Sequence, residues 1–167
     1  MPAGDFIVDT DAPMFYVSID ARGELAWPLN SFTWGDVKAH VLEVLTEAAS
    51  NGYKDFLRRR HISYIIAGKK QIDYAVMLDK LYQLGIKRLA IGGGGAINWS
   101  FVQQGLVDEV SMVLAPIADG DANQPRFFKA QEPYSQVSPV AFKLLGVEAL
   151  NDGVVWLRYS VKKQETS

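Results

Sequence analysis

Four consecutive glycines, Gly92–Gly95, are the residues of this 167-residue chain whose type and spacing best suit a chemical role. A glycine has no Cβ, so the run can adopt positive φ angles and lets another molecule touch the main chain. A helical pattern follows over Ile97–Gln104, and the first N–H groups of a helix have no partners inside it. Such donors, at the positive end of the helix dipole, bind phosphate groups. The sequence therefore predicts a nucleotide site here.

Other reactive side chains form no comparable group. His40 and His61 are the only histidines, they lie far apart in the chain, and cysteine is absent, so no metal site is predicted. Asp108 and Glu109 stand between a helix-ending glycine and a strand pattern, where a loop or capping role is favoured. Ser100 has no nearby base and no Gly-x-Ser-x-Gly pattern around it, which argues against nucleophilic catalysis.

Composition and charge narrow the class of protein. Seventeen basic and nineteen acidic residues give a net charge of −2 without a basic face, which excludes a typical nucleic-acid binder. The absence of cysteine excludes disulfides and fits a cytosolic protein. No apolar run approaches the ~20 residues of a membrane helix, and the N-terminus lacks the pattern of a signal peptide. We expect one cytoplasmic domain, without nucleic-acid or membrane partners.

Strand and helix patterns must position the glycine run. The predicted strands are Met14–Ile19, Ile62–Ala67, Arg88–Ile91 and Glu109–Ala115, and the predicted helices are Tyr53–Arg60, a segment capped by Asp73 and running to Leu84, and Ile97–Gln104. Trp27–Gly35 is predicted as a loop. Val37–Ala48 is ambiguous, because its apolar spacing slightly favours a helix whereas HVLEVLT alone suits a strand.

The order of these elements predicts an α/β fold. Between Ile62 and Ala115 strands alternate with helices over short links, which implies parallel pairing by right-handed crossovers. Ala141–Glu148 and Val154–Ser160 form a predicted antiparallel hairpin through Asn151–Gly153. We expect a mixed, mostly parallel sheet flanked by helices, with this hairpin at the C-terminus. Ligands of such sheets bind beyond the carboxyl ends of the strands.

The block GGGGAIN, followed by GLVDE and an apolar strand that ends in Ala-Pro, resembles the dihydrofolate-reductase-like family. This family includes the C-terminal reductase domain of the bifunctional riboflavin-biosynthesis deaminase–reductase. The resemblance continues through IKRLAIGGGG, ISYIIAG, FYVSIDARGEL and APIADG to the final hairpin. It implies one reductase-like domain over residues 14–160, after an irregular lead-in (1–13) and before a tail (161–167). It also favours a strand at 37–48.

The resemblance implies an NADPH-dependent reductase that transfers hydride to a pyrimidine or pteridine-like heterocycle, as in riboflavin biosynthesis. The residues implied to hold the pyrophosphate by their backbone are Gly93, Gly94, Gly95, Ala96 and Ile97. The residues implied to lie near the adenosine end are Asp20, Ala21 and Arg22, with Thr46 and Gly68 on the same side of the cofactor. Arg22 would pair with a 2′-phosphate, since a guanidinium matches phosphate geometry. No catalytic residue is assigned.

Two departures leave alternatives open. Riboflavin-pathway members carry a substrate-facing glutamate where this chain has Gly92, which leaves the substrate and proton donor undetermined. The family's initial strand–helix–strand has no counterpart before Met14, so the chain resembles the last two-thirds of a member, and whether the natural chain starts at Met1 stays open. The missing strands would expose a sheet edge, which a homodimer could cover. A non-catalytic nucleotide-binding module and an inactive fragment that needs a partner chain are the alternatives to the enzyme.

Overall fold

The computed structural model describes residues 4–118, 120, 123–135 and 138–162. Contacts divide the chain into two compact units, Met1–Arg88 and Leu89–Ser167, and each is described by itself below. Residues 1–3 of the predicted lead-in and 163–167 of the predicted tail lie outside the described residues. No helix of the described part is long and apolar enough to cross a membrane.

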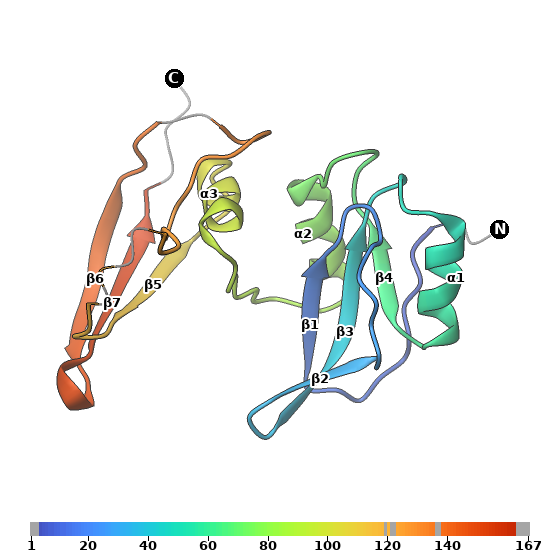
Figure 1. Ribbon diagram of the computed structural model, residues 1–167, viewed down its shortest axis with the longest axis horizontal. Helices are drawn as coiled ribbons and strands as arrows, with labels where there is room; N and C mark the ends of the chain where they lie inside the picture. Colours follow the sequence, from blue (N-terminus) through green and yellow to red (C-terminus); the bar gives the residue numbers. More distant parts are fainter. Residues whose placement is uncertain (1–3, 119, 121–122, 136–137, 163–167) are drawn as a thin grey trace. The chain divides into compact units, whose positions relative to one another are not determined.

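The first unit is built around β3 (Val37–Leu45) (Figure 1). This strand pairs in parallel with β1 (Met14–Ile19) along one side. Along its other side it pairs first with β2 (Ser31–Trp34), antiparallel, and then with β4 (Ser63–Ile66), parallel. The sheet is therefore mixed, and the strands predicted at 14–19 and 62–67 are confirmed within one residue at each end.

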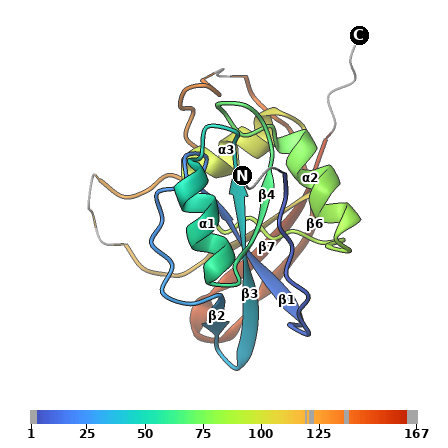
Figure 2. The same ribbon diagram turned by 90° about the vertical axis from the view of Figure 1, so that its right-hand side faces the viewer.

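Both faces of β3 are covered. Helix α1 (Asn51–Arg59) and helix α2 (Tyr74–Gln83) lie on opposite faces of the sheet (Figure 2). Every residue of β3 from Ala39 to Leu45 is buried in consequence. A run that is buried at every position also satisfies a helical period, which is why spacing slightly favoured a helix at 37–48. The helical interpretation was wrong, and the strand favoured by the resemblance is correct.

A polar side chain caps the N-terminus of each helix of this unit. The Ser50 hydroxyl accepts a 3.1 Å hydrogen bond from the Tyr53 N–H, and the Asp73 carboxylate accepts one of 3.0 Å from the Val76 N–H. Each bond satisfies an N–H group that has no partner within the helix. The predicted cap at Asp73 is confirmed, as is the helix predicted at 53–60, which begins two residues earlier than expected.

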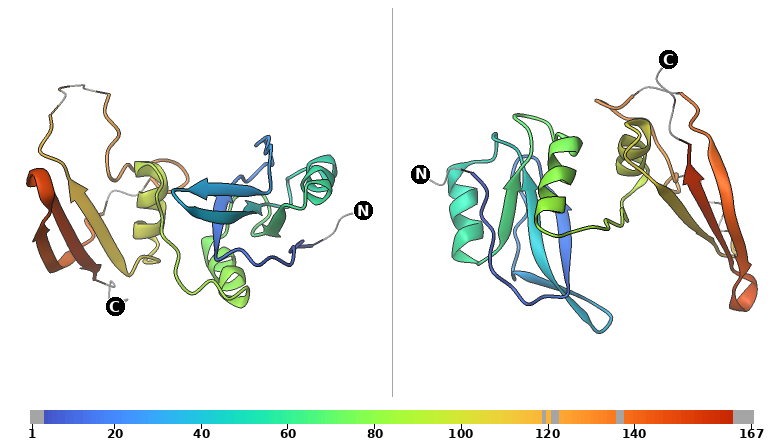
Figure 3. Two further views of the ribbon diagram at one scale, coloured as in Figure 1. Left: turned by 90° about the horizontal axis from the view of Figure 1, so that it is seen from below. Right: turned by 180° about the vertical axis from the view of Figure 1, so that it is seen from behind.

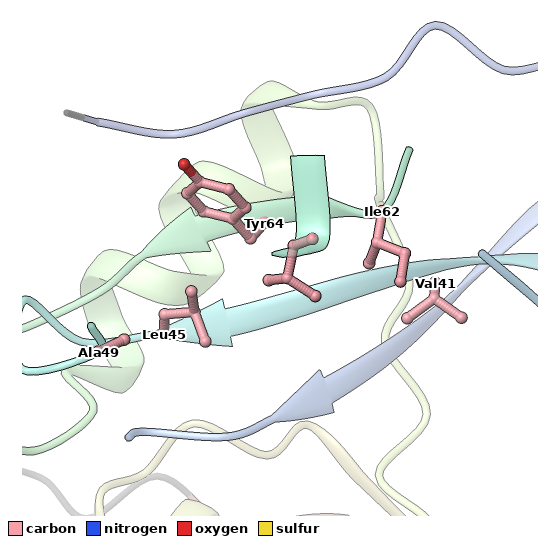
Figure 4. Packing of buried hydrophobic residues seen from close by; sticks show 6 residues of the cluster. Val41, Leu45, Ala49, Ile62 and Tyr64 are labelled. Atoms are coloured by element: carbon pink, nitrogen blue, oxygen red, sulfur yellow. The ribbon is translucent and has the colours of Figure 1, made fainter. Parts of the chain in front are cut away.

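The main apolar cluster lies between the sheet and α1. Val41 and Leu45 of β3 project to the same side as Tyr64 of β4 (Figure 4). The buried members of the cluster are Val41, Leu45, Ala49, Leu57, Ile62 and Tyr64. Arg58 Nε donates a 2.9 Å bond to the Tyr64 hydroxyl, which satisfies the polar end of this large ring at the edge of the core.

The second unit contains α3 (Gly95–Gln103) and an antiparallel sheet of β5 (Glu109–Leu114), β7 (Val155–Val161) and β6 (Phe142–Ala149) in that order. Strands β6 and β7 run side by side in both views of Figure 3. Their connection is a short 3-10 turn at Asn151–Gly153, in which Asp152 and Gly153 both have positive φ. The predicted hairpin and its turn are confirmed, and so is the helix predicted after the glycines.

Three expectations about the sheets need correction. Arg88–Ile91 is not a strand: among the described residues it pairs with no neighbour, and a strand exists only where its backbone is paired. β5 pairs antiparallel with β7, not in parallel as the strand–helix alternation implied. The predicted loop at 27–35 contains β2, whose register opposite β3 the sequence did not indicate. The fold is thus mixed α/β, and a mostly parallel sheet is not confirmed.

Candidate functional site

The start of α3 is open at its N-terminus. Gly94 is the N-cap residue, with φ −69° and ψ 173°, and none of the described side chains caps this helix, in contrast to α1 and α2. The three residues Gly92–Gly94 are exposed. The first N–H groups of α3 are therefore not occupied by a capping side chain, which is the arrangement that an anion site at a helix N-terminus needs.

The glycines of this run differ in how much room each position leaves for a side chain. A Cβ at Gly93 would lie 1.8 Å from Ile97 Cγ2, and one at Gly95 would lie 2.3 Å from the Arg126 carbonyl oxygen. A Cβ at Gly94 would meet nothing within 4 Å. None of Gly92–Gly95 has a positive φ, so close packing, not left-handed geometry, explains Gly93 and Gly95, whereas neither applies to Gly92 and Gly94.

A loop that sequence reasoning did not single out holds the start of α3. The Lys129 N–H donates a 2.9 Å bond to the Gly95 carbonyl oxygen, and Asn98 Nδ2 donates one of 3.1 Å to the Phe127 carbonyl oxygen. Trp99 makes an edge contact with Phe128, with ring centroids 6.4 Å apart. These bonds use backbone carbonyls, which carry no sequence signal, so the pattern of residue types could not reveal them.

In the first unit, the carboxyl ends of β1, β3 and β4 meet. Thr46 donates from its Oγ1 and from its N–H to the Ala21 carbonyl oxygen, at 2.6 and 3.1 Å. The Glu47 N–H donates a 3.0 Å bond to the Gly68 carbonyl oxygen. Gly68 has a φ of +105°, and a Cβ there would lie 2.1 Å from the Gln71 carbonyl oxygen. The structure thus brings Ala21, Thr46 and Gly68 together.

Asp20 and Arg22 have different surroundings within one turn. The buried Asp20 carboxylate accepts hydrogen bonds from the N–H groups of Gly23, Glu24 and Leu25, at 3.1, 2.7 and 2.8 Å. The carboxylate therefore makes its hydrogen bonds within its own turn, as is common for short polar side chains in turns. Arg22 is exposed and pairs with Glu24 at 3.0 Å, an ion pair that a phosphate can displace.

Sequence reasoning missed a buried carboxyl group, Glu43 in the middle of β3. One of its oxygens accepts a hydrogen bond from the Trp27 indole N–H, and the other, Oε2, has no hydrogen-bond partner within the described part of the chain. Burial and the Asp20 charge raise the pKa of Glu43, the Trp27 and Ser18 donors lower it, and the net result is a pKa of about 7. Its signal in the sequence is a lone acid within the apolar strand pattern HVLEVLT.

Tyr53 of α1 contacts the turn of Asp20, close to Glu43. Its hydroxyl donates a 2.8 Å bond to the Leu25 carbonyl oxygen and lies 3.3 Å from Asp20 Oδ2. Burial raises the pKa of this phenol, and the neighbouring carboxylates of Glu43 and Asp20 raise it further. Tyr53 therefore stays protonated and acts here as a hydrogen-bond donor.

The two histidines do not gather with acids. His40 is buried, its Nε2 lies 2.9 Å from Ser63 Oγ, and burial lowers its pKa. The Ser63 hydroxyl also accepts a 3.0 Å bond from the Val8 N–H. Within the part of the chain that the structure describes, no three His, Asp or Glu side chains are placed to hold a metal ion.

The residues implied to bind the cofactor form one set in each unit. The set of the first unit is Asp20, Ala21, Arg22, Thr46 and Gly68, and that of the second is Gly93, Gly94, Gly95, Ala96 and Ile97. Hydrogen bonds join the members of the first set to one another or to the same turn, and the second set is one continuous stretch of backbone at the start of α3.

Comparison with known proteins identifies relatives over most of the chain. Residues 19–156 match the sequence model of the RibD C-terminal domain. A 98-residue stretch is 31% identical to the 2,5-diamino-6-ribosylamino-4(3H)-pyrimidinone 5′-phosphate reductase of Aquifex aeolicus, and covers 59% of this chain and 44% of that protein. A 62-residue stretch is 37% identical to the reductase of the same name from Methanothermobacter thermautotrophicus, and covers 37% of this chain and 29% of that protein.

Solved structures show the same fold. A pyrimidine reductase-like protein from Corynebacterium diphtheriae superposes with a TM-score of 0.69 at 17% identity, over 89% of this chain and 61% of that one. RibD of Acinetobacter baumannii superposes with a TM-score of 0.60 at 22% identity, over 87% of this chain and 37% of that one. The chain thus spans less than half of the reductases it matches by sequence and less than two thirds of these solved chains.

Proposed function

The chain belongs to the RibD C-terminal domain family, and from this membership we propose that it forms the cofactor-binding part of an NADPH-dependent reductase acting on a pyrimidine heterocycle. Two relatives are named as reductases of a ribosylamino-pyrimidinone phosphate, which supports this substrate class over a pteridine. The family match over residues 19–156 supports treating residues 14–160 as one reductase domain.

The single observation that carries the proposal is the start of α3, which no described side chain caps and which follows the exposed, open Gly94. Gly94 leaves space where a diphosphate has to touch main chain, and the backbone N–H groups of residues 95–97 face the ligand as donors. Gly93 and Gly95 keep this stretch in place, because a side chain at either would collide with Ile97 or with the Arg126 carbonyl. The residues present therefore fit a dinucleotide.

The first unit contributes binding and orientation. Arg22 exchanges Glu24 for the 2′-phosphate of the cofactor, which distinguishes NADPH from NADH. Ala21, Thr46 and Gly68 present a rigid backbone edge beside the adenosine, fixed by the 2.6 Å bond of Thr46 to Ala21. When bound, the nicotinamide supplies the hydride, and the protein supplies position and electrostatics. Gly92 brings no carboxylate to the substrate.

We also propose a cytoplasmic homodimer. Among the described residues, β1 pairs only with β3, so its outer edge is available to a further strand. The absence of cysteine suits a reducing compartment. Size-exclusion chromatography with light scattering measures the oligomeric state directly.

The test is a titration with NADPH of the chain and its Gly94→Val variant, followed by nicotinamide fluorescence. We expect the variant to bind at least about tenfold more weakly, because the valine occupies the diphosphate's place, while stability changes by less than about 1 kcal/mol. Gly52→Ala in α1, where the nearest atom to the added Cβ is 3.9 Å away, is the matched control and should bind like the wild type. Equal affinity in all three proteins contradicts the proposed site.

Turnover separates the enzyme from its alternatives. Oxidation of NADPH by a ribosylamino-pyrimidinone phosphate supports the reductase. Binding without oxidation, even when the chain is mixed with the part of a relative that it does not span, supports a nucleotide-binding module. Failure of the wild-type chain to bind NADPH contradicts the proposal outright.

A further inference from the structure

The segment 20–30 lies across the face of the first sheet that α1 also covers, and side chains hold it at several points. Tyr53 donates to the Leu25 carbonyl oxygen at 2.8 Å, and Arg60 Nη1 donates to the Pro28 carbonyl oxygen at 2.7 Å. Between these two points, the Trp27 indole N–H donates to Glu43 on β3. Trp27 also makes an edge contact with Tyr16 of β1 at 6.0 Å between ring centroids. Glu43 is thus the anchor beneath the middle of the segment.

Glu43 is an unusual anchor, because its carboxyl group is fully buried and only half satisfied. Oε1 has the Trp27 indole as its partner, whereas Oε2 has none among the described residues. A buried carboxylate needs two or more donors to offset the loss of water. With a proton on Oε2 the group is neutral, Oε1 still accepts from Trp27, and the charge penalty disappears.

We propose that Glu43 is a proton switch that sets how firmly the segment 20–30 is held on the sheet. With the proton bound, Trp27 is anchored and the Asp20 turn is undisturbed. With the proton lost, Glu43 carries a charge that the Asp20 charge opposes, and Oε2 has no hydrogen-bond partner among the described residues. The segment then loosens, so that Glu43 gains water.

The groups around Glu43 act in both directions, and burial with the Asp20 charge outweighs the hydrogen bonds that favour the ionised form. The end of β1 contributes Asp20, whose negative charge opposes ionisation, and Ser18, whose hydroxyl moderately favours it. Helix α1 contributes Tyr53, a phenol that stays protonated. On β4 the residue opposite Glu43 is Tyr64, whose hydroxyl already accepts a bond from Arg58. Burial raises the pKa of Glu43 to about 7, so the switch operates near neutral pH.

The switch also bears on cofactor binding, a step that rests on the proposed function. Ala21 and Arg22 are the second and third residues of the segment 20–30, so its loosening displaces the backbone proposed to lie beside the adenosine. Glu43 is in this sense a positioning residue, which acts through Asp20 and Trp27 without touching the cofactor. Loss of its proton also adds a negative charge to a site for a polyanion.

The direct test follows the indole N–H of Trp27 by nuclear magnetic resonance between pH 5 and pH 9, with the signal assigned through Trp27→Phe. In the wild-type chain we expect a single transition with a midpoint of about 7. In Glu43→Gln, whose amide oxygen still accepts from the indole, the transition should vanish. A Trp27 signal that does not change in the wild type, or that titrates equally in the variant, overturns the proposal.

A second measurement uses the wild-type chain alone and therefore does not depend on whether the variant folds. The carboxyl carbon of Glu43 in the labelled wild-type chain reports its own ionisation, and a midpoint below pH 5 contradicts the switch. For the cofactor step, NADPH affinity is compared at pH 6 and pH 8 in both proteins. The cofactor's own phosphate titrates equally in both, so the difference isolates Glu43. We expect the wild type to lose about twofold more affinity than Glu43→Gln, the effect of one charge about 10 Å away through water.

The two proposals fail separately. If NADPH binds neither protein while Trp27 titrates, the proposed function fails and the switch stands. If NADPH binds and Trp27 does not titrate, the switch fails and the function stands. Equal pH dependence of NADPH affinity in both proteins overturns the coupling between them.

Discussion

Thr46 and Ala21 join the carboxyl ends of β3 and β1 through a two-pronged contact, in which the Thr46 hydroxyl and N–H both donate to one carbonyl oxygen, at 2.6 and 3.1 Å. The Thr46 hydroxyl also accepts from the Ala48 N–H at 3.2 Å. A fully buried hydroxyl that donates and accepts in this way fixes the positions of two chain segments at once.

We expect Thr46→Val to lower the free energy of unfolding by about 1 kcal/mol, because the isosteric methyl removes the 2.6 Å bond to the Ala21 carbonyl oxygen, whereas the Ala48 N–H keeps the Lys69 carbonyl oxygen as an acceptor at 3.1 Å. The same variant should bind NADPH more weakly, since Ala21 loses its shorter bond. Urea unfolding and a fluorescence titration measure the two effects. Thr33→Val on the exposed part of β2 is the control, and an equal loss of stability there would count against this account.

Stability should depend on pH through Glu43. Its pKa is about 7 in the folded chain and 4.5 ordinarily, so the folded state holds the proton more tightly than the unfolded state does. The contribution of this proton to the free energy of unfolding is fully present below about pH 4.5 and is lost as the pH rises through about 7. The loss amounts to about 3 kcal/mol at most. Urea unfolding of the wild type and Glu43→Gln between pH 4 and pH 8 measures the difference, which should favour the variant increasingly with pH and then level off.

The titration of His40 changes the stability with pH in the opposite direction to that of Glu43. Its contribution cancels when the wild type is compared with Glu43→Gln. Burial lowers its pKa from 6.5, so its part of the stability is present above about pH 6.5 and is lost as pH falls. Because His40 is unchanged in Glu43→Gln, it cancels in the difference between the two proteins. A difference that is constant from pH 4 to pH 8 would mean that Glu43 does not titrate in this range.

Ser63 should matter for the N-terminal segment. Its hydroxyl accepts from the Val8 N–H at 3.0 Å and lies 2.9 Å from the His40 ring, and Ser63→Ala leaves both buried or half-buried groups without this partner. We expect a loss of about 1–3 kcal/mol and faster hydrogen exchange of the Val8 amide. Ser111→Ala removes an exposed bond to Trp156 in the other unit and serves as the comparison. Unchanged exchange at Val8 would contradict the expectation.

The sequence predicted those parts of the fold that rest on local rules. The cap at Asp73, the turn at Asn151–Gly153 and the helix after the glycines follow from residue types a few positions apart. The strand predicted at 88–91 is absent because a short, mostly apolar run indicates only that a strand would be tolerated, whereas its existence depends on a distant partner. The direction of β5 failed for the same reason.

The candidate site was predictable to the same degree. Glycine spacing indicated the backbone at residues 93–97, and the structure adds that Gly93 and Gly95 are fixed by packing while Gly92 and Gly94 are open. Glu43 escaped notice because a buried acid looks, in a sequence, like any charged residue of a half-exposed strand. Only the position of Trp27 and the burial of both faces of β3 give it a role.

The bridge between Phe6 and β4 has a consequence for how this protein behaves at high concentration. Phe6 and Tyr64 exchange two backbone hydrogen bonds, of 2.9 and 2.8 Å, on the side of β4 that faces away from β3. Asp5 adds a bond to the Ile66 N–H and is held in turn by Lys80. These few residues therefore cover the outer edge of β4, so that strands of neighbouring molecules cannot pair with it.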